Sequence, residues 1–152
     1  MKRRLRFAAV LAGLFIGLPG AAAFADSVYH THQYDLTAVN AAPLRSGFVE
    51  NIHADGPNVY AHEQYVLNGA APNTTYQVVL IIFPLDTTCS STLITIPTAT
   101  IQTNAAGNGV AYHVFTPADA AGLRGLTVGA MWTVSAGSSR SYQTSCETVA
   151  LD

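Results

Sequence analysis

Five histidines are the residues of this chain whose type and spacing come nearest to those of a reactive site. His30 and His32 lie two positions apart, so on a β-strand both rings project to the same side of the sheet. Paired imidazoles of this kind are typical ligands of copper and zinc in β-sandwich proteins. A third ligand would have to come from His53, His62 or His113, and the sequence alone cannot place these in space.

The histidine pair also has a simpler interpretation, in which His30 and His32 face water near the N-terminus or pack at the edge of a sheet. No second His-x-His, no HExxH motif and no cysteine ligand accompanies the pair. Copper enzymes of the superoxide-dismutase type are the nearest enzyme analogy, but they need further histidines on defined strands together with a bridging His and Asp. The sequence therefore favours a protein without a metal or other cofactor, in which His30 and His32 are weak candidates for metal ligands.

Catalytic groups of other kinds are not indicated either. The GxSxG nucleophile motif is absent. No spacing singles out a pair of carboxylates for acid–base chemistry, since the acidic side chains are scattered: Asp35, Glu50, Asp55, Glu63, Asp86, Asp119 and Glu147. We therefore expect no catalytic residue and, in all, a non-enzymatic protein.

The N-terminal segment has the three parts of a secretory signal peptide. Basic residues at 2–6 precede an apolar run from Phe7 to Leu18, and Ala23-Phe24-Ala25 fits the A-x-A cleavage rule. The apolar run is shorter than the roughly 20 residues that span a bilayer, which disfavours a membrane anchor. We expect cleavage before Asp26, a signal peptide over 1–25, a single domain over 26–152, and a bacterial protein secreted to the periplasm or the medium.

Cleavage would change the charge of the chain. It removes four of the seven basic residues and none of the nine acidic ones, so the formal net charge goes from −2 to −6. The basic residues that remain are three arginines, without any lysine: Arg45, Arg124 and Arg140. An acidic surface disfavours nucleic acid and anionic membranes as partners, because both require a basic footprint.

Cys89 and Cys146 are the two cysteines. In an exported chain an even number of cysteines predicts a disulfide. A metal-bound or catalytic thiolate is the alternative, but neither cysteine has a CxxC neighbour or a catalytic signature around it. The predicted bridge would join a loop in the middle of the chain to its last strand.

The longest apolar run, Tyr76–Phe83, predicts a central strand, because nearly every position on both faces is apolar and Pro84 ends it. One face would carry Val79, Ile81 and Phe83, which cannot all remain exposed to water. We expect another segment to cover this second face, and the candidates are Thr116–Leu126 and the segment around Phe48. The alternative is that the face forms a docking patch for a partner.

Turn residues separate further runs along the chain. Leu126–Val134 alternates strictly and places Trp132 in the core. Gly47–Ile52 predicts a short strand with Phe48 and Ile52 inward. Asn104–Gly109 predicts a hairpin connection. The other predicted elements are strands over 26–39, 59–67, 92–103 (an edge strand or a bulge at Pro97), 110–115 and 141–151, and a helical turn within 116–126.

Roughly seven or eight short strands without a long helix predict an all-β fold, an antiparallel β-sandwich of Ig-like, Greek-key type. The arrangement resembles immunoglobulin-like and fibronectin-type sandwiches in architecture, and the Cys…Trp…Cys order holds. Trp132 lies near the second cysteine, however, whereas immunoglobulins place it soon after the first, so no family is assigned. The sequence predicts an exported binding or envelope-associated module whose partner is an unknown protein or small-molecule ligand. The alternative is a copper or zinc metalloprotein or redox enzyme that uses His30 and His32.

Overall fold

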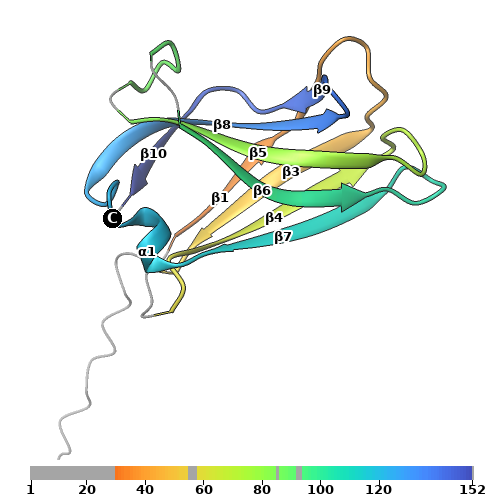
Figure 1. The fold of residues 1–152 in the computed structure, drawn as a ribbon. Coiled ribbons are helices and arrows are strands. Elements are labelled where there is room, and N and C mark those ends of the chain that lie inside the picture. Colours follow the sequence, from red (N-terminus) through yellow and green to blue (C-terminus); the bar gives the residue numbers. More distant parts are fainter. Residues whose placement is uncertain (1–29, 55–57, 85, 92–93, 152) are drawn as a thin grey trace, which may run out of the picture.

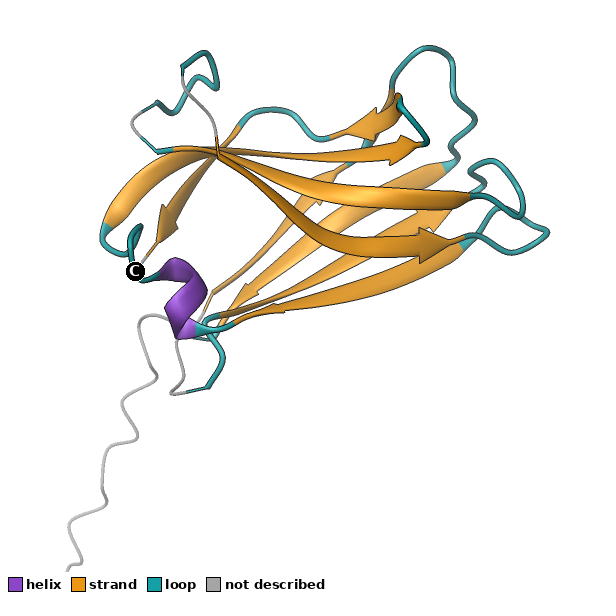
Figure 2. Ribbon diagram, viewed as in Figure 1, coloured by secondary structure: helices purple, strands orange, loops and turns teal. Residues whose placement is uncertain are grey.

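The computed structural model of the chain describes residues 30–54, 58–84, 86–91 and 94–151. Within these residues, ten strands form two antiparallel β-sheets, accompanied by one short helix (Figures 1 and 2). The all-β prediction is confirmed. The predicted signal peptide over 1–25 lies outside the described residues. No helix in the described part of the chain is long and apolar enough to cross a membrane.

The smaller sheet contains four of the described strands in the order β1-β3-β4-β7. Two-residue periodicity places alternate side chains on its inner and outer faces. The strands at its centre are β3 (Ser46–His53) and β4 (Ala61–Asn68), and those at its edges are β1 (His30–Asp35) and β7 (Gly109–Phe115).

The larger sheet contains the other six described strands in the order β2-β9-β8-β5-β6, with β10 also paired to β8. The predicted central strand is β5 (Thr75–Phe83), which is bonded to β8 on one side and β6 on the other. The remaining strands are β2 (Thr37–Ala38), β6 (Ile94–Gln102), β8 (Leu126–Ala136), β9 (Ser139–Gln143) and β10 (Glu147–Leu151).

Several boundaries differ from the predicted ones. The first predicted strand changes sheet at the buried Leu36, which separates β1 from β2. Asn104–Gly109 does not form a hairpin, because β6 and β7, which it joins, belong to different sheets. Pro97 lies in an edge strand beside a register shift, as the missing donor of proline requires. The predicted last strand is divided into β9 and β10, which pair with different parts of β8.

The core lies between the facing sides of the two sheets. The inward side of β8 carries Val128, Ala130, Trp132 and Val134, none of which is more than 3% exposed, as its alternation predicts. On β3 the prediction was wrong, since Val49 and His53 are buried while Phe48 and Ile52 are only half-buried. The inner face of β3 therefore carries polar as well as apolar side chains.

The second face of β5 is buried at Ile81 and Phe83 and half-buried at Val79, and the segment that lies on it near Phe83 is not one of the predicted covers. Ile81 and Phe83 are 6% and 4% exposed. Phe83 is the register partner of Gly129, where a Cβ atom would overlap the carbonyl oxygen of Asp86 and lie 3.1 Å from Sγ of Cys89. Loop 86–91 therefore lies on the outer side of this sheet.

The segments predicted to cover that face lie elsewhere. Helix α1 (Pro117–Ala120) contributes Ala120 to the core between the sheets, and Phe48 belongs to the four-stranded sheet. The covering loop is held by Asp86, whose carboxylate accepts hydrogen bonds from the backbone nitrogens of Thr88 and Ser90 at 2.7 and 2.6 Å. The hydrogen bond from the Thr88 hydroxyl, together with these two backbone bonds, holds the pKa of the Asp86 carboxyl well below its ordinary value.

Cys89 and Cys146 are joined in the structure, with their Sγ atoms 2.03 Å apart, as predicted. The bond links loop 86–91 to the segment between β9 and β10. Closing a loop of 57 residues stabilises the fold by roughly 4 kcal/mol in the chain-entropy model. The bridge therefore holds the covering loop against the six-stranded sheet.

Candidate ligand-binding cavity

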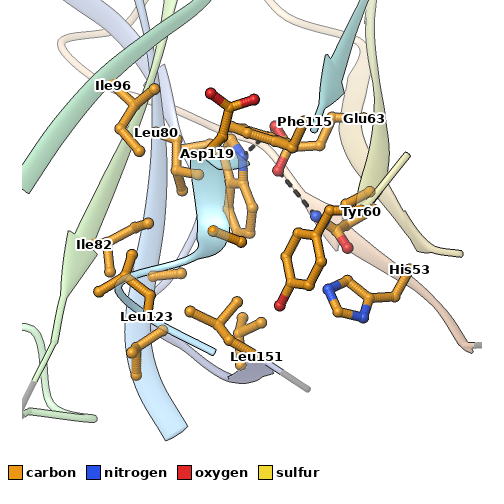
Figure 3. A pocket seen from close by; sticks show the side chains of 17 residues that line it. His53, Tyr60, Glu63, Leu80, Ile82, Ile96, Phe115, Asp119, Leu123 and Leu151 are labelled. Atoms are coloured by element: carbon orange, nitrogen blue, oxygen red, sulfur yellow. Dashed lines mark hydrogen bonds between the residues drawn. The ribbon is translucent and has the colours of Figure 1, made fainter. Parts of the chain in front are cut away.

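A cavity of about 50 Å³ lies between the two sheets, at the end of the molecule where α1 is found (Figure 3). The six-stranded sheet contributes aliphatic side chains on one side, including Leu80, Ile82 and Ile96. The four-stranded sheet contributes polar and aromatic side chains on the other, and Figure 3 shows Glu63, Tyr60 and His53 there. The two walls of the cavity therefore differ in chemistry.

Glu63 is the most buried acidic residue of the described chain, with 1% of its surface exposed. Alternation along β4 places it on the inner face together with Ala61, Tyr65 and Leu67. The register of β3 and β4 pairs it with Asn51, and β8 of the opposite sheet brings Trp132 toward it. The carboxyl group therefore lies inside the core, at the wall of the cavity.

Three donors hold this carboxyl group. Asn51 Nδ2 donates to Oε1 at 2.9 Å, and Trp132 Nε1 donates to Oε2 at 3.0 Å. The hydroxyl of Tyr65 also donates to Oε2. Because Trp132 belongs to the other sheet, the hydrogen bond from its indole connects the two sheets across the core. We name Glu63, Asn51, Tyr65 and Trp132 the Glu63 cluster.

Burial dominates the electrostatics of the cluster. Removal from water raises the pKa of the Glu63 carboxyl, and the hydrogen bonds from Tyr65, Trp132 and Asn51 oppose this shift without cancelling it. Burial and the adjacent carboxylate raise the pKa of the Tyr65 hydroxyl far above its ordinary value. Burial, with smaller effects from Glu147 and Glu63, raises the pKa of Tyr34 to about 12. The buried surroundings of Glu63 therefore disfavour additional negative charge.

Aromatic rings surround the cluster. Tyr34 stacks on Trp132 with ring centroids 5.0 Å apart. The buried rings of His53 and Tyr60 meet edge to face at 4.2 Å. The guanidinium of Arg124 lies over the Tyr60 ring, 5.3 Å from its centroid.

This arrangement can receive a small molecule and offer it apolar contact, aromatic surface and a hydrogen-bond acceptor. The walls fit the general form of small-molecule sites, which are concave and mostly apolar with a few placed polar groups.

Comparison of the chain with protein-family models, with curated proteins and with solved structures found no match.

The structure keeps His30 and His32 together on β1, where the register pairs His30 with His53 of β3, and it places His62 and His113 on β4 and β7. His32 is exposed on β1, with its ring stacked 6.1 Å from that of Tyr34, and His30 begins the same strand. His62 is exposed on β4, whereas the next residue, Glu63, points inward. No group of three or more His, Cys, Asp or Glu side chains within the described residues is arranged to hold a metal ion.

His113 belongs to the same cross-strand row as His32, but not to the same site. The register pairs His32 with Asn51, Asn51 with Glu63, and Glu63 with His113. Three strand spacings separate the two histidines, which amounts to about 14 Å. His113 instead packs against Phe115, with ring centroids 4.4 Å apart.

The sequence interpretation missed the Glu63 cluster. It counted Glu63 among the scattered carboxylates, although it expected a strand over 59–67. Alternation in that strand places Glu63 on the same face as Tyr65 and Leu67, and this signal would have identified a carboxyl group on an otherwise apolar face.

Proposed function

We propose that this chain is an exported, non-enzymatic β-sandwich module that binds a small molecule in the cavity beside the Glu63 cluster. The observation that carries the proposal is the cavity itself. It is open enough for about four water-sized spheres, and a buried carboxyl group lines it among apolar side chains.

The connectivity supports a sandwich of the Ig-like, Greek-key type. The hairpins β3–β4, β5–β6 and β8–β9 each stay within one sheet, while the connections β4–β5, β6–β7 and β7–β8 pass to the other sheet. As a result β7 returns beside β4, and β8 returns beside β5. Greek-key connections between two antiparallel sheets are the defining pattern of such sandwiches.

The leader pattern and the disulfide support export to the periplasm or the medium, because disulfides persist in oxidising compartments. We expect the mature protein to begin at Asp26. N-terminal sequencing of protein recovered outside the cytoplasm would check this, and recovery of chains that still begin at Met1 would contradict export.

Trp132 is the single tryptophan of the chain, so its fluorescence reports directly on the cavity. We expect one or more small organic molecules from a panel of neutral, cationic and anionic compounds to change this fluorescence in a saturable way. Ala130→Val should abolish the response, because Ala130 lines the cavity and two added methyl groups would occupy its space.

Ala111→Val is the matched control for that experiment. Ala111 is half-buried on β7 and does not line the cavity. This variant should respond to the same compounds as the parent protein. A parent protein that responds to no compound, or an Ala130→Val variant that responds equally well, would contradict the proposal.

A further inference from the structure

We propose that the cavity selects a methylated ammonium group, a small organic cation with at most one N–H donor. This inference rests on the proposed binding function and adds the chemical class of the ligand to it. Four features of the cavity support it: its charge, the hydrogen bonds of Glu63, its aromatic walls and its size.

The ionisable side chains that line the cavity favour positive charge in a ligand. They are Glu63, Asp119, His53 and Tyr60. Neither lysine nor arginine is among the described lining residues, and the nearest cation described is the Arg124 guanidinium over the Tyr60 ring. Glu63 is the buried acidic group of this lining, whereas Asp119 is exposed on α1. The Asp119 carboxylate accepts hydrogen bonds from the nitrogen and hydroxyl of Thr116 at 2.7 and 2.8 Å, which hold it in place.

Among the residues that the structure describes, none of the hydrogen-bond donors to Glu63 is cationic. Its three donors are an amide, an indole and a phenol, all of them neutral. Burying a carboxylate without a countercharge is costly, and a cation in the cavity would supply that charge. A carboxylate offers about four acceptor positions, so the three donors leave one for a ligand.

The aromatic walls suit the methyl groups of such a ligand. Trp132, Tyr60 and Phe115 all line the cavity. The faces of these rings attract cations, and aromatic surroundings of this kind recognise quaternary and methylated ammonium groups. A primary ammonium is a poorer match, because its three N–H donors would compete for one remaining position on the carboxylate.

The volume of the cavity limits the size of the group that can enter it. One water requires roughly 10–15 Å³ by this measure of volume, so the cavity of about 50 Å³ holds a group of about four non-hydrogen atoms. Trimethylammonium, with one nitrogen and three carbons, has this size. The geometry therefore favours the ammonium end of a ligand rather than a large ring.

Three probes that each carry three methyl groups on one central atom test the inference: trimethylammonium chloride, tert-butyl alcohol and sodium pivalate. They are cationic, neutral and anionic, and they contain four, five and seven non-hydrogen atoms. Titration monitored by Trp132 fluorescence at constant ionic strength should give an affinity for trimethylammonium at least tenfold above that for tert-butyl alcohol. Pivalate should bind more weakly than either. These comparisons use the parent protein and do not depend on any variant folding.

Glu63→Gln then tests the role of the carboxylate. The amide of Asn51 can turn so that its oxygen accepts from the new glutamine, which preserves the hydrogen bonds and the shape of the site. We expect this variant to bind trimethylammonium and tert-butyl alcohol within about threefold of each other.

The outcomes separate the two proposals. Equal affinity for trimethylammonium and tert-butyl alcohol in the parent protein would overturn the cationic ligand and leave the binding cavity standing. A preference that survives in folded Glu63→Gln would remove the carboxylate from the inference. Binding of none of the three probes would contradict this inference, and the binding function itself would then depend on the wider panel.

Discussion

Replacing Ile81 with aspartate should leave the domain largely unfolded at room temperature. Ile81 is 6% exposed on the outer side of β5, so its side chain contributes about 1.5–3 kcal/mol by burial. An aspartate there would also bury a charge without a partner, which costs several kcal/mol more. The sum is comparable with the 5–15 kcal/mol that stabilises a typical domain.

Urea denaturation followed by circular dichroism would measure the effect. Ile94→Asp is the matched control, because Ile94 is 42% exposed on β6 of the same sheet and pairs with Ile82. This control should lose no more than about 1 kcal/mol, since exposed positions tolerate charge. An Ile81→Asp variant with the denaturation midpoint of the parent protein would show that this face of β5 is not buried.

The position of β5 could be predicted from the sequence because burial on both faces leaves a continuous apolar run. The need for a cover followed from the same run. The identity of the cover could not be predicted in the same way. The Cys89–Cys146 bridge was predicted, but the face of the sheet on which it places loop 86–91 depends also on the close approach of Asp86 to Gly129. Both contacts join residues distant in sequence, and local patterns do not record such contacts.

The faces of β3 illustrate a second limit. Apolar side chains ordinarily mark the inner face, so Phe48 and Ile52 were expected to point inward. Instead the inner face carries Asn51 and His53 beside the cavity, and the apolar pattern is reversed there. The prediction failed where the strand contributes to the candidate site, since buried polar side chains violate the rule on which the prediction was based.

The substitution Glu63→Leu should destabilise the domain by about 3 kcal/mol or more. The substitution leaves three donors in the core without their acceptor: the amide of Asn51, the hydroxyl of Tyr65 and the indole of Trp132. Each buried donor that loses its partner costs about 1–3 kcal/mol, whereas the apolar surface gained by leucine offsets only part of the total. Urea denaturation at neutral pH would measure the difference.

Glu50→Leu is the control for this substitution. Glu50 is half-buried on β3 and pairs with Gln64, which follows Glu63 on β4. The outer position of Glu50 should limit its effect to about 1 kcal/mol. If Glu63→Leu were no less stable than Glu50→Leu, the Glu63 cluster would not contribute to holding the two sheets together.

Glu63→Gln should change how stability depends on pH. Because the pKa of Glu63 is raised in the folded protein, the folded state holds this proton more tightly than the unfolded chain does. This contribution to stability is complete below the ordinary value of 4.5 and is lost as the pH rises from there through the raised pKa. The Glu63→Gln side chain does not titrate, so this variant should lack the decline in unfolding free energy that Glu63 causes as the pH rises.

The difference in unfolding free energy between Glu63→Gln and the parent protein isolates the contribution of Glu63 to the pH dependence from those of other carboxyl groups. Asp86 and Asp119 have lowered pKa values, so their contributions are present above their unfolded pKa values and are lost as the pH falls. Both residues are unchanged in Glu63→Gln, and the difference in unfolding free energy between variant and parent cancels them. That difference should shift in favour of the variant as the pH rises from 4 to 8. A constant difference would mean that Glu63 ionises at the same pH in the folded and unfolded chains, and the buried carboxylate would then have no need of a cation.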